Sequence, residues 1–132
     1  PFAEALRENN ATHAYIVHSD DGMDEISPFA KTKVVELNKD KIIEFTIDPK
    51  EFGIVAKNRN NLKGKNALYN SQKIIEIYKG TFNEFSQAVS LNVAAGLIVS
   101  AKENDFKNAY NKATEHLNSG KVFQFLSKIR VS

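Results

Sequence analysis

Two adjacent carboxylates, Asp24 and Glu25, carry the clearest chemistry in this sequence. They follow a short apolar run at residues 14–17, which predicts a buried strand, and they lie in a loop that Gly22 opens. In open α/β sheets, ligands bind at this edge, outside the carboxyl ends of the strands. Hard oxygen ligands with no thiol or imidazole among them suit Mg²⁺ better than zinc. The pattern therefore predicts a magnesium site at Asp24 and Glu25, and Mg²⁺ in turn indicates a phosphorylated substrate.

The residues around this pair have simpler interpretations. Asp20 and Asp21 are expected to be solvated or turn-forming, Asp21 because it precedes a glycine; whether either assists the metal stays open. His18, at the end of the strand, is expected to be a hydrogen-bonded structural residue and not a catalytic base. No Ser/His/Asp arrangement is recognisable, so the sequence assigns no catalytic residue and no cofactor-binding residue other than the metal ligands.

Three further features bear on this edge of the sheet. Asn92 lies within an apolar helix, where an unpaired amide costs roughly 1–3 kcal/mol. We therefore expect a loop backbone to pair with it and to hold that helix at the edge of the predicted site. Thr32 is expected to begin a hairpin. Arg59 and two neighbouring lysines, Lys63 and Lys65, form a mildly basic loop that is expected to be a solvated face.

Composition narrows the class of protein. The 132 residues suffice for one modest domain, and the formal net charge of +2 gives no reason to expect a nucleic-acid or membrane partner. Cysteine is absent, which excludes a disulfide framework, a thiol nucleophile and a zinc knuckle. No apolar run approaches the ~18 residues of a membrane span, and no signal-peptide pattern is seen. We expect a cytoplasmic protein.

The periodicity of the chain predicts both strands and helices. The expected elements are a short helix ending near residue 9, a strand at 14–17, a hairpin of 32–37 and 42–47 with a loop of about four residues, a helical turn at 48–53 capped by Asp48, a loop at 54–64, and helices at 67–78, 82–101, 106–117 (capped by Asn104) and 122–129. The stretch 82–101 is apolar on nearly every side and is expected to be a central, buried helix.

These elements indicate the α/β class. They comprise one parallel-type strand plus a β-hairpin, packed with about five helices. One parallel-type strand cannot make a sheet alone, and a single hairpin is marginal. We therefore expect the chain to be part of a larger α/β domain whose other strands lie elsewhere.

Several stretches resemble anthranilate phosphoribosyltransferase, in the order of that family and at roughly its spacing. They are residues 16–27, 32–37, 48–53, 90–97 and 119–121. The most specific is Gly22-Met23-Asp24-Glu25-Ile26-Ser27, whereas Ser19 stands where the family often has glycine. The resemblance implies that residues 1–132 are the C-terminal portion of one catalytic α/β domain of the nucleoside phosphorylase/phosphoribosyltransferase type. The helical N-terminal domain and the half that carries the phosphate loop are then absent.

The resemblance also implies a function. The family transfers phosphoribose from phosphoribosyl pyrophosphate (PRPP) to anthranilate in tryptophan biosynthesis, so the chain is expected to be part of a glycosyltransferase, a pentosyltransferase. Asp24 and Glu25 would bind the Mg²⁺ that accompanies the pyrophosphate. The missing N-terminal part of the same protein is an implied partner, and a homo-oligomer is expected. Because the family's glycine-rich phosphate loop and anthranilate site are not found here, the isolated chain is expected to be inactive.

Two alternatives stay open at this point. One keeps the fold and changes the substrate, giving a fragment of an enzyme like the pyrimidine nucleoside phosphorylases. The acidic pair disfavours it, because phosphorolysis does not need this Mg²⁺ clamp. The other is a non-catalytic α/β module that binds a partner.

Overall fold

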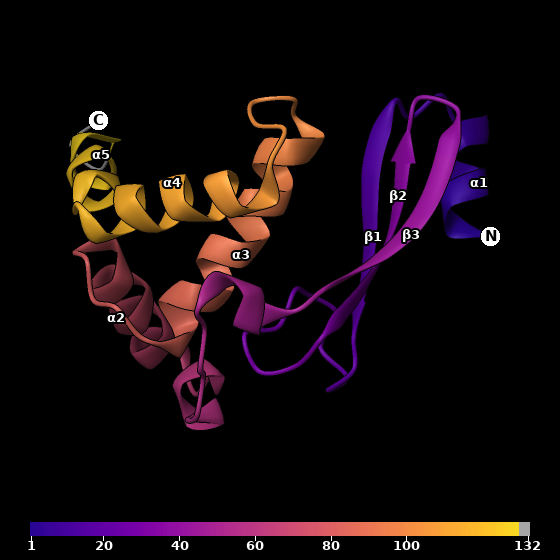
Figure 1. Cartoon of the computed structure of the whole chain (residues 1–132). Helices are drawn as coiled ribbons and strands as arrows, with labels where there is room; N and C mark the ends of the chain where they lie inside the picture. The colour runs from indigo at the N-terminus through magenta and orange to yellow at the C-terminus, as the bar shows by residue number, and fades with distance from the viewer. Residues whose placement is uncertain (130–132) are drawn as a thin grey trace.

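The computed structural model describes residues 1–129 as a small sheet joined to a group of helices (Figure 1). The elements are α1 (Phe2–Glu8), β1 (His13–Ser19), β2 (Thr32–Asn38), β3 (Lys41–Ile47), the 3₁₀ turns η1 (Pro49–Phe52) and η2 (Arg59–Leu62), α2 (Ala67–Tyr78), α3 (Glu84–Val99), α4 (Phe106–Asn118) and α5 (Lys121–Ile129). The predicted α/β class and the count of about five helices are confirmed.

The sheet has three antiparallel strands in the order β1-β2-β3. The prediction that β1 is a parallel-type strand without a partner is therefore wrong. β1 pairs along its whole length with β2, from His13 opposite Asn38 to Ser19 opposite Thr32. Its apolar run looks like a parallel strand because both faces of the sheet are covered, one by α1 and the other by the main core.

The hairpin of β2 and β3 is confirmed, with a tighter turn than expected. Asn38 pairs with Lys41, which leaves only Lys39 and Asp40 in the turn. Lys39 adopts a positive φ of 55°, the conformation that two-residue hairpin turns require. The helical turn after β3 is also confirmed: the Asp48 side chain accepts a hydrogen bond from the Lys50 amide at 3.0 Å.

The helices lie where the apolar periodicity predicts them, with two corrections. The N-cap of α4 is Asp105, whose side chain accepts from the Asn108 amide, and not Asn104. Helix α3 is buried on one face only, because Val93 on its other face is 46% exposed while Leu91 and Ala94 are fully buried. Within residues 1–129, no helix is long and apolar enough to cross a membrane.

The main core forms where the sheet meets α3 and α4 (Figure 1). Its buried members come from the loop before β2, from β2 and β3, from the segment after η1, and from α3 and α4: Ile26, Val34, Ile47, Ile54, Leu91, Ala94, Ile98, Ala109 and Tyr110. Ile26 is 1% exposed and directly follows the acidic pair in sequence. The loop that carries Asp24 and Glu25 is therefore fixed to the core at one end.

Candidate functional site

The acidic motif lies in the loop that joins β1 to β2, residues 20–31. The last strand pair is Ser19 with Thr32, and the loop begins with a hydrogen bond of 2.8 Å from the Asp20 amide to the Lys31 carbonyl. The expectation that the motif follows a strand end is confirmed, although the strand is antiparallel. The loop lies at the end of the sheet that meets α3 (Figure 1).

Asp24 and Glu25 are both exposed, and neither makes a hydrogen bond or an ion pair with the residues that the structure describes. They line a cavity of about 740 Å³ whose other walls come from η2, α3 and their surroundings: Met23, Leu62, Lys63, Phe85, Ala88, Val89, Asn92 and Val93. The structure therefore presents two unpaired carboxylates to an open cavity with a largely apolar wall and one lysine.

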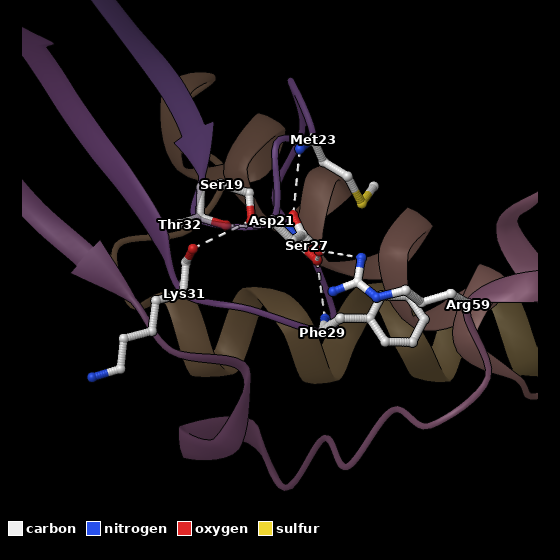
Figure 2. Close-up of polar contacts among 8 residues, drawn as sticks. All are labelled: Ser19, Asp21, Met23, Ser27, Phe29, Lys31, Thr32 and Arg59. Carbon is white, nitrogen blue, oxygen red and sulfur yellow. Dashed lines mark hydrogen bonds and ion pairs between the residues drawn. The ribbon is translucent and has the colours of Figure 1, made fainter.

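Asp21 lies in the same loop but, unlike Asp24 and Glu25, its side chain is buried and hydrogen-bonded (Figure 2). Its side chain is 7% exposed. One carboxylate oxygen accepts hydrogen bonds from Ser27 Oγ at 2.7 Å and Arg59 Nη1 at 2.8 Å, and the other accepts from the Met23 amide at 3.3 Å. Burial by itself raises the pKa of Asp21, but hydrogen bonds from Ser19, Ser27, Met23 and Arg59 outweigh it, so the pKa lies at about 2. The expectation that Asp21 forms a turn is confirmed, because its side chain accepts from the amide two residues further on, whereas the alternative that it is solvated is wrong.

The partners of Asp21 tie three segments together. Arg59, expected on a solvated face, pairs with Asp21 and lies over the Phe29 ring at 4.8 Å from its centroid. The Ser27 hydroxyl donates to Asp21 and accepts from the Phe29 amide at 3.0 Å. Thr32 begins β2 as predicted, is fully buried, and accepts from the Ser27 amide at 3.2 Å. The loop thus closes around a buried charge.

Asn92 holds helix α3 to this loop, as the sequence predicts. Its Oδ1 accepts from the Ile26 amide at 3.0 Å, and its Nδ2 donates to the Ile26 carbonyl at 3.0 Å. The same amide nitrogen also donates to the Ala88 carbonyl within the helix at 2.9 Å. The side chain therefore pairs with both backbone groups of the residue next to Glu25, and the prediction is confirmed.

The donor chemistry of the acidic pair fits Mg²⁺. Mg²⁺ usually takes one or two protein carboxylates and completes its octahedron with water and substrate phosphates. Asp24 and Glu25 supply that number of ligands. Residues 1–129 contain no group of three or more His, Cys, Asp or Glu that could hold a metal ion.

One histidine differs from expectation. His18, expected to be hydrogen-bonded, is exposed. His13 contacts Glu36 at 2.8 Å with 17% of its side chain exposed. Asp21 was missed as an organising residue because its partner Arg59 lies 38 positions away, beyond the reach of a local pattern.

Comparison with known proteins identifies the family. Residues 1–123 match the family described as "Glycosyl transferase family, a/b domain". The chain belongs to this family. The predicted resemblance is confirmed as well, because the chain is 49% identical over 129 residues to an anthranilate phosphoribosyltransferase from Pelagibacter ubique (strain HTCC1062). That alignment covers 98% of this chain and 39% of the relative.

Solved structures of this glycosyl transferase family share the fold. An anthranilate phosphoribosyltransferase from Thermus thermophilus superposes with a TM-score of 0.85 and 29% identity, covering 97% of this chain and 37% of that one. The anthranilate phosphoribosyltransferase from Saccharomyces cerevisiae in complex with PRPP and Mg has the same fold, with a TM-score of 0.80 and 22% sequence identity. The match covers 96% of this chain and 37% of the yeast chain.

The chain therefore spans somewhat less than two-fifths of the length of the relatives it matches. These shares give the length matched and not its position, so the assignment to the C-terminal portion of the catalytic domain stays a prediction. The magnesium site at Asp24 and Glu25 stays a prediction too.

Proposed function

We propose that this chain contributes the magnesium-binding acidic pair of an anthranilate phosphoribosyltransferase, a pentosyltransferase of tryptophan biosynthesis. The reaction would transfer the phosphoribosyl group of PRPP to the amine of anthranilate and release pyrophosphate. One observation carries the proposal: in a chain 49% identical to such an enzyme, two exposed and unpaired carboxylates line an open cavity.

In this proposal Asp24 and Glu25 hold the metal ion through their free oxygens. When bound, Mg²⁺ would neutralise negative charge on the departing pyrophosphate. Lys63 lines the same cavity and adds a positive charge that suits an anionic substrate. The hydrogen bonds between Asn92 and Ile26 keep the carboxylates at the mouth of that cavity.

The rest of the active site would come from a longer polypeptide. The relatives are about two and a half times as long as this chain, since it covers 39% of the first of them. We propose that the remaining part supplies the phosphate-binding loop and the anthranilate site, that the complete enzyme works in the cytoplasm, and that it forms a homo-oligomer. The two alternatives gain no specific support, because the relatives reported above are anthranilate phosphoribosyltransferases.

An activity assay tests the proposal. The 132-residue chain and the longer polypeptide that contains it are each incubated with PRPP, anthranilate and Mg²⁺, and phosphoribosyl anthranilate is followed by the loss of anthranilate fluorescence. We expect turnover only from the longer polypeptide. No transfer by it, or transfer by the chain alone that Asp24→Ala abolishes, would contradict the proposal.

A further inference from the structure

In the segment of residues 22–27, four of the six residues make hydrogen bonds to the rest of the protein. The Gly22 amide donates to the Ser19 carbonyl at 3.0 Å, and the Met23 carbonyl accepts from the Ser19 amide at 3.1 Å. On the far side, both backbone groups of Ile26 are bonded to Asn92. Within the described part of the chain, Asp24 and Glu25 alone in this segment have no partner.

The two sides of this gap are fixed by different parts of the protein. On the N-terminal side, the Asp21 carboxylate binds the Met23 amide and is itself held by Arg59 and Ser27 (Figure 2). On the C-terminal side, Asn92 belongs to α3, and Ile26 is buried in the main core. The dipeptide therefore lies between two anchors, each of which is held by a residue distant in sequence, Arg59 on one side and Asn92 on the other.

We propose that Asp21 and Asn92 are positioning residues that fix the backbone on either side of Asp24 and Glu25 and so preorganise the pair to bind a metal–pyrophosphate complex. The inference rests on the proposed function, because it takes the pair as the metal ligands. The physical reason is entropic: ligands held in place before binding lose less freedom when the metal arrives. Residues that orient metal ligands typically contribute about 10- to 100-fold to metal affinity.

The same contacts argue against a purely structural role for this arrangement. A buried carboxylate is costly to desolvate, and here Ser27, Arg59 and the Met23 amide compensate that cost. Asn92 lies half-buried on the face of α3 that lines the cavity with Ala88 and Val89, and its amide bonds both backbone groups of Ile26. Both polar groups converge on the one segment whose two acidic side chains stay free.

Nuclear magnetic resonance on the 132-residue chain tests the inference with Mn²⁺ and inorganic pyrophosphate as the probe. Paramagnetic broadening of the backbone amides of residues 23–26 reports the metal at the acidic pair, and its Mn²⁺ dependence gives an apparent dissociation constant. Asp21→Ala and Asn92→Ala are each expected to raise that constant by about 10-fold, at the lower end of the range for such residues. Faster amide hydrogen exchange at Met23 in the first variant and at Ile26 in the second should accompany the loss.

Matched controls separate positioning from general effects. Asp20→Ala is the control for Asp21→Ala, because it removes the same charge from the neighbouring, exposed residue. Asn111→Ala is the control for Asn92→Ala, because it removes a side-chain amide from an exposed position on a helix. Both should leave the apparent constant within about twofold. Asp21→Asn keeps an acceptor oxygen for the Met23 amide and should recover most of the affinity. If Asp21→Ala does not fold, Asn92→Ala carries the test.

The outcomes distinguish the two proposals. No selective broadening in the unmodified chain, or broadening that survives Asp24→Ala, would overturn the proposed metal role and the inference with it. Broadening that disappears in Asp24→Ala but titrates unchanged in folded Asp21→Ala and Asn92→Ala would overturn the positioning role alone.

Discussion

Asp21 and the pair Asp24–Glu25 occupy one loop, three positions apart, in opposite surroundings. Asp21 is 7% exposed and accepts hydrogen bonds on both of its oxygens. Asp24 and Glu25 are exposed and have no partner among residues 1–129. The difference separates a carboxylate that holds the loop together from carboxylates whose oxygens are free for a ligand.

This contrast shows that burial and partners, not residue type, assign the roles of acidic residues in a loop. Buried charges are retained only where hydrogen bonds or ion pairs compensate their desolvation. Exposed carboxylates that line a cavity do not need that compensation, and they keep their capacity to bind a metal. Substitution of each carboxylate in turn can therefore separate stability from metal binding.

The largest effect is expected at the exposed pair. In the longer polypeptide, Asp24→Asn combined with Glu25→Gln should lower kcat by about 100-fold, because a metal ion contributes several kcal/mol of charge stabilisation. The free energy of unfolding should change by less than about 0.5 kcal/mol, as for other exposed side chains. Steady-state kinetics and urea titration measure the two quantities. A stability loss of several kcal/mol with unchanged kcat would reverse the assignment of roles.

Removing the buried carboxylate should lower stability in addition to weakening metal binding. Asp21→Ala leaves Ser27 and the Met23 amide without their acceptor, and such losses cost about 2 kcal/mol. The matched change Asp20→Ala, at an exposed neighbour, should cost less than about 0.5 kcal/mol. Urea unfolding followed by circular dichroism compares them. Equal effects of the two variants would mean that the contacts of Asp21 do not stabilise the chain.

The contribution of Asp21 should depend on pH in a defined direction. Its pKa in the folded chain, about 2, lies below the ordinary value of 3.8, so the stability it provides is complete above about pH 4 and is lost as the pH falls toward 2. The difference in unfolding free energy between the unmodified chain and Asp21→Asn should shrink over that window.

A second carboxylate titrates in the same window and has to be controlled. A hydrogen bond from Asn61, together with backbone amides, lowers the pKa of Glu84 to about 2. Because Glu84 is present in both proteins, its effect cancels in the difference between them. A difference that stays constant from about pH 5 to about pH 2 would show that the ionised form of Asp21 is not the one that stabilises the fold.

The smallest effect concerns the metal alone. We expect the 132-residue chain to bind Mg²⁺ only weakly without a phosphate ligand, with a dissociation constant of about 1 mM or higher, because Mg²⁺ relies on substrate oxygens in such sites. Isothermal titration calorimetry measures this directly. Tight binding would indicate a third protein ligand, and Asp20 would be the candidate, since both oxygens of Asp21 are already engaged.

Local patterns predicted much of the fold. Apolar periodicity identified α1, the hairpin and the four later helices, and the Asp48-Pro49 pair marked the turn at η1. The pairing of β1 was not predicted, because the loop before β2 is too long for a hairpin signal and both faces of β1 are covered. Strand pairing depends on contacts between residues distant in sequence, which periodicity does not report.

Part of the candidate site could likewise be predicted from the sequence, and part only from the structure. The sequence by itself singled out Asp24 and Glu25, gave the family resemblance, and indicated that Asn92 needs a loop partner, because an unpaired amide in an apolar helix is costly. Only the tertiary structure decided that this partner is Ile26 and that Asp21 is buried against Arg59. The physical reason is that burial and hydrogen-bond partners belong to the folded arrangement: Asp20 and Asp21 are neighbours along the chain, and folding brings Arg59 to only one of them.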